Sequence, residues 1–166
     1  MACLLVSCEP KPIEKHEFLE FRLHRWIALE GGEIIVIRRI GNEWKAILMG
    51  DGSRFSCLYN REVKPKSDWN QVWNAILSKG VREVSSPERD FGIEDGDGFV
   101  GELNENERLS RFSISHPGSR ETDSAKKILE ISDYLSREFD SPVFVADYDR
   151  GKVGEYLINI CMDLRK

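Results

Sequence analysis

The chain lacks any apolar run that approaches the roughly 20 residues of a membrane-spanning helix. It also lacks a glycine-rich phosphate loop, a dinucleotide fingerprint and a Gly-x-Ser-x-Gly nucleophile motif. Its four cysteines form neither a Cys-x-x-Cys pair nor a Cys/His spacing that suits zinc. The sequence therefore predicts no transmembrane segment, no bound metal and no cofactor.

Composition and charge indicate a single globular domain. The chain has 166 residues, 40% of them apolar and 32% charged. A chain of this length and composition can bury a hydrophobic core that is stable without disulfides or bound metals. Its net charge of −5 is unevenly placed: residues 1–66 carry 11 Lys/Arg and 9 Asp/Glu, whereas residues 67–166 carry 13 and 20. An acidic second half repels phosphate backbones, so no nucleic-acid partner is expected. A charged partner would be a basic protein.

Residues 1–12 are interpreted as a leader remnant or a flexible N-terminal segment, and residues 13–166 as a single α+β domain. Leu5-Val6-Ser7-Cys8 is similar to the cleavage box of bacterial lipoproteins, in which the cysteine receives the lipid. A secretory leader also needs a basic start and an apolar core of about 7–15 residues, which do not precede Cys8 here. Two alternatives stay open: a truncated leader with a lipid anchor at Cys8 and a cell-envelope location, or a chance match in a cytoplasmic protein.

Antiparallel strands are predicted between Ile13 and Val63. The segment Glu33–Ile40 is rich in β-branched residues and too short for an independent helix. Gly41-Asn42 is typical of a two-residue hairpin turn. Gly50-Asp51-Gly52 predicts another turn, and Arg54–Tyr59 a further strand. This meander should have one buried and one solvated face.

Two amphipathic helices are predicted after the meander. Ser67 can cap the first, Asp68 suits its positive end, and Gly80 ends it. Thr122 or Asp123 caps the second, which ends at Asp140-Ser141-Pro142. The apolar stripe of the first helix consists of Trp69, Val72, Trp73, Ile76 and Leu77. The predicted fold class is α+β, an antiparallel sheet of about five to seven strands with two helices packed on one face.

The C-terminal segment is harder to assign. Val143–Val145 is expected to form a strand. Apolar residues between Tyr156 and Leu164 fit both a strand and a helix, and the strand is favoured. Cys57 and Cys161 are expected to be small buried apolar residues rather than the two halves of a disulfide.

The segment Glu94–Pro117 is the predicted working region, a hairpin that reverses at Asn104–Glu107. Between Glu83 and Glu107 the chain carries nine acidic residues, which could attract a cationic partner. Glu102 and Arg111 should lie close together on adjacent strands. The candidate binding residues are Asp95, Asp97, Glu102, Arg111 and His116.

Two more specific interpretations of this hairpin are not favoured. Asp95 and Asp97 fit the first positions of a calcium loop, but Phe99 and Asn106 occupy places that need an oxygen ligand and a glutamate. Ordinary turn chemistry is the better interpretation. His116 stands before a proline at the end of a strand, where a surface histidine is expected more often than a general base.

The order of elements resembles that of a family of small bacterial proteins, many of them exported lipoproteins, over about residues 20–140. The resemblance lies in an Ile-Arg-rich strand, Asp68-Trp69 near a helix start, Asp95-Gly96 before Phe99 and Glu102, and Arg111-Phe112 before Pro117. It implies the fold and a cell-envelope location, but no reaction.

The preferred hypothesis is a non-enzymatic bacterial binding protein that uses the acidic hairpin surface. The first alternative is a toxin-neutralising immunity protein, because a small acidic domain suits a basic partner. The second alternative is a small hydrolase with His116 and Asp95 or Asp97 in its site. A pocket that joins His116 to a carboxylate would favour the hydrolase.

Overall fold

The computed structural model describes residues 17–28, 31–52, 57–86, 96–119, 122–147 and 149–163. The strands are β1 (Phe18–Ile27), β2 (Gly31–Ile40), β3 (Glu43–Gly52), β4 (Cys57–Val63), β5 (Gly98–Glu105) and β6 (Arg108–Ser115). The α-helices are α1 (Trp69–Ser78), α2 (Asp123–Phe139) and α3 (Arg150–Asp163). Helix α1 lies between β4 and β5 in the chain, and the other two helices follow β6.

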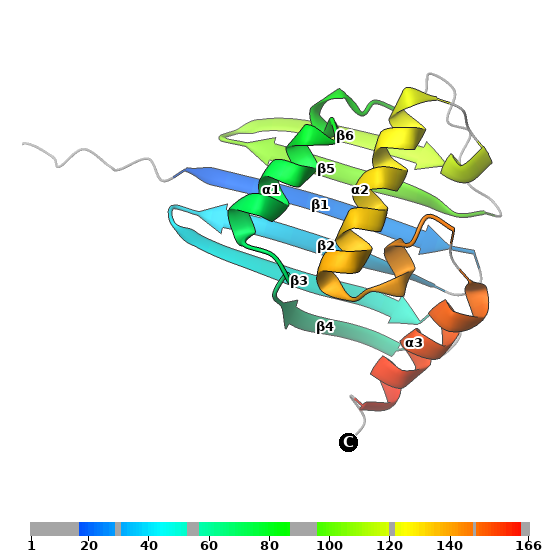
Figure 1. Cartoon of the computed structure of the whole chain (residues 1–166). Helices are drawn as coiled ribbons and strands as arrows, with labels where there is room; N and C mark the ends of the chain where they lie inside the picture. Colours follow the sequence, from blue (N-terminus) through cyan, green and yellow to red (C-terminus); the bar gives the residue numbers. More distant parts are fainter. Residues whose placement is uncertain are drawn as a thin grey trace, which may run out of the picture.

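The six strands form one antiparallel sheet in the order β4-β3-β2-β1-β5-β6. The first four strands are a meander, and the later hairpin joins it because β5 pairs with β1. Figure 1 shows α1 and α2 on one face of the sheet, with α3 at the corner beside β4. The predicted fold class is confirmed, and α3 is an addition to the two helices that were expected.

One continuous core lies between the sheet and the helices α1 and α2. Alternate side chains of each strand point to opposite faces of a sheet, so the odd-numbered residues of β1 and β2 face the helices. Trp73 on α1 is buried as predicted, and Trp44 of β3 packs against it with ring centroids 5.6 Å apart. The buried core residues include Phe21, Leu23, Ile35, Ile37, Leu48, Val72, Trp73, Ile76, Ile128 and Leu135.

The start of α1 differs slightly from the prediction. Its N-cap is Asp68, whose Oδ1 accepts a hydrogen bond from the Asn70 N–H at 2.8 Å. Ser67 instead donates its hydroxyl hydrogen to the Glu138 carboxylate of α2 at 2.9 Å, which ties the two helices together. Gly80 follows the helix with φ of 80°, the left-handed conformation that a glycine adopts without strain.

The hairpin turn at Gly41-Asn42 is confirmed, but the turn predicted at Gly50-Asp51-Gly52 is wrong. Strand β3 continues through all three residues. A side chain at Gly50 would have its Cβ 2.3 Å from the Tyr59 ring, so glycine is needed here for close packing rather than for a turn. Strand β4 includes Cys57–Tyr59 of the strand predicted at Arg54–Tyr59, and residues 54–56 of that prediction lie outside the described residues.

The segment after α2 is a short 3-10 helix, Pro142–Phe144, and the strand predicted at Val143–Val145 is wrong. Proline at the first position of the helix fixes φ near the helical value. The Ser132 hydroxyl of α2 donates a hydrogen bond to the Phe144 carbonyl oxygen inside the core. The buried Phe144 carbonyl oxygen thus has a hydrogen-bond donor without being paired to a neighbouring strand.

The strand favoured between Tyr156 and Leu164 is also wrong, because residues up to Asp163 belong to α3. Its buried residues Val153, Leu157 and Cys161 are spaced by four, as one face of a helix requires. The Asp149 carboxylate accepts a hydrogen bond from the Gly151 N–H at 2.8 Å and so caps the first turn. A helix satisfies its backbone hydrogen bonds internally, so α3 needs no further strand as a partner.

Cys57 and Cys161 form a disulfide, which corrects the expectation that they are separate buried residues. Their Cα atoms lie 5.9 Å apart. The bond joins the edge strand β4 to α3, across 104 residues of sequence. A pairing over this separation leaves no local sequence signal; it arises because α3 turns Cys161 toward the start of β4.

Reduction of this disulfide should lower the free energy of unfolding by several kcal/mol. A crosslink that closes a loop of roughly 100 residues contributes up to about 4.7 kcal/mol in the chain-entropy picture, and residual structure in the unfolded state reduces that value. The measurement is guanidinium unfolding with and without dithiothreitol. In a Cys57→Ala/Cys161→Ala variant the reductant should have no effect, and identical midpoints for oxidised and reduced wild type would contradict the prediction.

Candidate functional site

The face of the sheet opposite α1 and α2 is covered by no other element in the described ranges. This face is not simply polar, because β2 contains the unbroken apolar run Ile34-Ile35-Val36-Ile37. Ile35 and Ile37 point into the core, so Ile34 and Val36 point to the open face. Their partners on β3 are Met49 and Ile47, which continue the apolar surface.

These four apolar residues form the floor of a hollow of about 510 Å³, here called the sheet groove. Its volume lies within the range of roughly 300–1,000 Å³ that is usual for small-molecule sites. Cationic side chains stand at its rim. The full lining is Arg22, His24, Ile34, Val36, Arg38, Lys45, Ile47, Met49, Val100 and Glu102.

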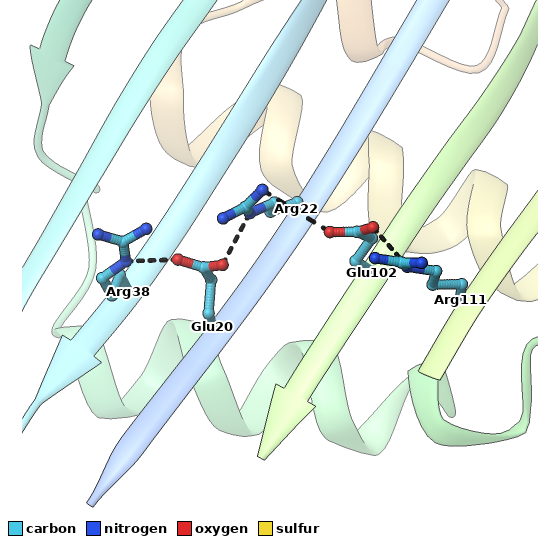
Figure 2. A network of polar contacts seen from close by, with 5 residues as sticks. All are labelled: Glu20, Arg22, Arg38, Glu102 and Arg111. Atoms are coloured by element: carbon cyan, nitrogen blue, oxygen red, sulfur yellow. Dashed lines mark hydrogen bonds and ion pairs between the residues drawn. The ribbon is translucent and has the colours of Figure 1, made fainter. Parts of the chain in front are cut away.

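A ladder of alternating charges crosses the same face over β2, β1, β5 and β6 (Figure 2). The Glu20 carboxylate accepts hydrogen bonds from Nε of Arg22, at 2.7 Å, and from Nε of Arg38. Arg22 also lies 3.7 Å from the Glu102 carboxylate, which pairs with Nε of Arg111 at 2.7 Å. The ladder therefore positions two guanidinium groups, those of Arg22 and Arg38, at the rim of the sheet groove.

The predicted proximity of Glu102 and Arg111 is confirmed, since the two residues are directly opposite in the pairing of β5 with β6. The Arg111 side chain is 67% exposed. An exposed pair of this kind stabilises a fold by less than about 1 kcal/mol. Glu102 also lines the sheet groove, whereas Arg111 lies outside it.

Asp97 has a structural partner inside the molecule. Its Oδ2 lies 3.4 Å from a terminal nitrogen of Arg25, whose side chain is fully buried. Arg25 also donates a hydrogen bond to the Val145 carbonyl oxygen, and its guanidinium lies 5.0 Å from the centroid of the Phe99 ring. Asp97 thus helps to compensate a buried cation. Asp95 lies outside the described residues.

His116 is exposed, as the sequence indicated, and does not line the sheet groove. Its backbone N–H donates to the Asp97 carbonyl oxygen at 2.8 Å, and its φ is 48°. Its ring packs over Gly96, where an added Cβ would stand 1.9 Å from Nε2. His116 and Asp97, the pair named in the hydrolase hypothesis, are thus joined by a backbone hydrogen bond, and neither lines the sheet groove.

A second group of polar side chains surrounds Glu33 on the covered face, near α3. The buried Glu33 carboxylate accepts hydrogen bonds from the hydroxyls of Tyr59, at 2.5 Å, Tyr156, at 3.2 Å, and Ser141. Burial raises the pKa of Glu33, although these hydrogen bonds and the nearby Arg61 cation oppose the shift. Burial also raises the pKa of both tyrosines, and the neighbouring Glu33 adds to the shift.

Sequence reasoning missed most of the sheet groove. Its cations Arg22, Arg38 and Lys45 were not among the candidate residues, although Glu102 was. The available signal was the run Ile34–Ile37, because four consecutive apolar residues make a strand apolar on both faces. In a sheet with helices on one face only, the second apolar face must remain open or find a partner.

The described part of the chain contains no group of three or more His, Cys, Asp or Glu residues placed to hold a metal ion. None of its helices has both the length and the apolar character needed to cross a membrane. No family model matches the chain, and no curated protein or solved structure is significantly similar to it. Arguments about function therefore rest on the geometry of the open sheet face.

Asp97→Lys should lower the free energy of unfolding by about 1–3 kcal/mol, since it removes a carboxylate from a buried guanidinium and adds a second cation there. Urea unfolding measures the change. Glu107→Lys, a charge reversal at an exposed turn residue of the same hairpin, is the control and should change stability by less than about 0.5 kcal/mol. An Asp97→Lys variant as stable as wild type would show that Asp97 is an ordinary surface acid.

Glu33→Gln should alter how stability depends on pH. Because the pKa of Glu33 is raised from 4.5 in the folded state, its stabilising contribution is complete below that value and is lost as pH rises through the folded pKa. The variant lacks this titration. The free energy of unfolding of wild type, minus that of the variant, should therefore fall from pH 4.5 toward neutral pH. Denaturant titrations across this range test it, and a constant difference would contradict it.

Proposed function

We propose that the protein is a non-enzymatic binding protein whose ligand occupies the sheet groove. The observation that carries the proposal is an apolar floor on an uncovered sheet face, formed by Ile34, Val36, Ile47 and Met49. A contiguous apolar surface with a polar border is typical of an interaction site rather than of an ordinary solvated face. The ladder centred on Glu20 supports the proposal because it keeps the charged border in a fixed arrangement.

The acidic hairpin is less well suited to be the working face. Glu105 pairs with Arg82 at 2.6 Å and Asp97 pairs with Arg25. Glu83, which precedes the hairpin in the same acidic segment, pairs with Lys127 at 2.5 Å. The hydrogen bond from Arg82 also lowers the pKa of Glu105. Local pairing of this kind weakens the field that would attract a basic protein partner. The immunity-protein hypothesis depends on a basic protein partner, so the local pairing of these acidic residues also weakens the case for it.

The hydrolase hypothesis has little support among the described residues. His116 is exposed and stands outside the sheet groove. The Asp97 carboxylate is engaged by Arg25. A general base must lie within hydrogen-bond reach of its substrate, and neither His116 nor Asp97 lines the sheet groove.

The proposal includes a location in an oxidising compartment such as the bacterial cell envelope. The Cys57–Cys161 disulfide supports it, because disulfides persist in exported proteins and are rare in the reducing cytosol. The similarity of Leu5–Cys8 to a lipoprotein cleavage box points the same way, with Cys8 as the lipid anchor.

An uncharged apolar fluorophore, N-phenylnaphthylamine, tests the binding function. Its fluorescence should rise on addition of the protein, and Ile47→Glu should weaken binding at least about tenfold, a loss of about 1.4 kcal/mol, by placing a carboxylate in the groove floor. Leu109→Glu is the matched control, since Leu109 is 50% exposed on β6 and outside the groove. Binding that survives Ile47→Glu unchanged would remove the groove from consideration.

A further inference from the structure

We propose that the ligand of the sheet groove is a single-chain amphiphilic anion, with its acidic head group at Arg22, Arg38 and Lys45 and its apolar chain on the groove floor. This inference rests on the binding function proposed above and specifies the chemistry of the ligand. A fatty carboxylate, an alkyl sulfate and an alkyl phosphate share this chemistry. The proposal commits to a free amphiphile rather than to a membrane surface, because a hollow admits a single chain and a flat bilayer cannot enter it.

Charge complementarity selects the sign of the head group. Three cations, Arg22, Arg38 and Lys45, line the groove, against the single carboxylate of Glu102. Including Glu20, which binds both arginines, still leaves one cation in excess. Lys45 also pairs with Glu62 at 2.7 Å, but both side chains are more than half exposed and the pair is weak.

The register of the sheet adds a more specific argument. Arg38 and Lys45 are directly opposite one another in the pairing of β2 with β3. Like charges in this relation destabilise a sheet, because cross-strand neighbours are only about 4.5–5.5 Å apart at Cβ. Glu20 beside Arg38 and the exposed Glu62 beside Lys45 offset part of this repulsion, and an anion between the two cations would add attraction to both. The pair therefore marks the place where the head group binds.

Glu20 prepares the arginines for this role. Its side chain is 7% exposed and accepts hydrogen bonds from Nε of both Arg22 and Arg38. A guanidinium held through Nε can still donate from its terminal nitrogens, although one of those of Arg22 already lies 3.7 Å from the Glu102 carboxylate. Figure 2 joins Glu20 to Nε of Arg38 and draws no contact from the terminal nitrogens of Arg38 to the other residues shown. Because both guanidinium groups are already oriented, little side-chain freedom is lost when an anion binds.

The apolar part of the site is elongated, which favours a chain. A second hollow of about 260 Å³ shares His24, Ile34 and Met49 with the sheet groove and extends toward Leu58 of β4, which is 82% exposed. From Lys45 to Gly50 along β3 the strand rises about 17 Å, at roughly 3.4 Å per residue. The surface is thus cationic at one end and apolar along its length.

Displacement of N-phenylnaphthylamine by alkyl ions below their micelle concentrations tests the inference. Dodecanoate and dodecyl sulfate should displace the probe at concentrations at least tenfold lower than dodecyltrimethylammonium, which has the same chain and the opposite charge. Across octanoate, decanoate and dodecanoate, affinity should rise by at most about fourfold per methylene, which corresponds to about 0.8 kcal/mol for a buried CH₂. Added salt should reduce the preference for the anion.

An Arg38→Gln/Lys45→Gln variant should lose this preference for the anion while it still binds N-phenylnaphthylamine, which also shows that it is folded. Arg108→Gln removes an exposed cation of β6 outside the groove and should keep the preference. Equal displacement by the anion and the cation in wild type would overturn the inference but leave the binding function intact. Failure of the probe to bind would overturn the binding function itself. Two further results would also overturn the inference. If the protein bound anionic vesicles but not monomeric dodecanoate, the groove would be a membrane-binding surface. If sedimentation showed a dimer that the probe dissociates, the groove would be the contact between two copies of the chain.

Discussion

The pairing of β1 with β5 holds the two parts of the sheet together. It joins an N-terminal meander to a hairpin that follows α1 in the chain, and so makes a sheet of six strands. The register places Arg22 opposite Glu102 and Arg25 opposite Phe99. One pairing therefore creates both the charge ladder of the open face and the buried site of Arg25 on the covered face. It also gives α1 and α2 a surface wide enough to share.

The two faces of the sheet differ in their surroundings, because one is packed against helices and the other is open. On the covered face, side chains pack against α1 and α2 in one large cluster and against α3 in a second, smaller one. On the open face, the centre of β2 and β3 stays apolar while charged residues surround it. A strand exposed to water usually alternates between apolar and polar residues. The departure from this pattern at Ile34 and Val36 is the physical reason to place the function on the open face.

At the corner of the sheet, α3 is held against the edge strand β4 by a disulfide and by hydrogen bonds to Glu33. The Cys57–Cys161 disulfide fixes α3 to the edge strand, and Glu33 accepts hydrogen bonds from β4, from α3 and from Ser141. Edge strands expose unpaired backbone groups, and a helix at the edge limits their pairing with other chains. Neither Cys57 nor Cys161 lines the sheet groove, and Glu33 stands on the face opposite it. Among the residues of these edge contacts, Tyr59 borders the surface proposed to bind a ligand, because it lines the second hollow.

Elements whose causes are local could be predicted from the residues alone. Gly41-Asn42 specified a hairpin, the stripe around Trp73 specified α1, and Asn104–Glu107 specified the reversal that brings Glu102 to Arg111. Tertiary structure decided whatever depends on partners distant in the chain. Gly50 is a packing site for Tyr59 and not a turn, Cys161 pairs with Cys57, and Asp97 compensates the buried Arg25. The groove belongs to the same class, because its cations and its apolar floor come from strands that meet only when the sheet has formed. Periodicity shows which side chains share a face of one strand, whereas the register between strands decides which side chains meet across that face.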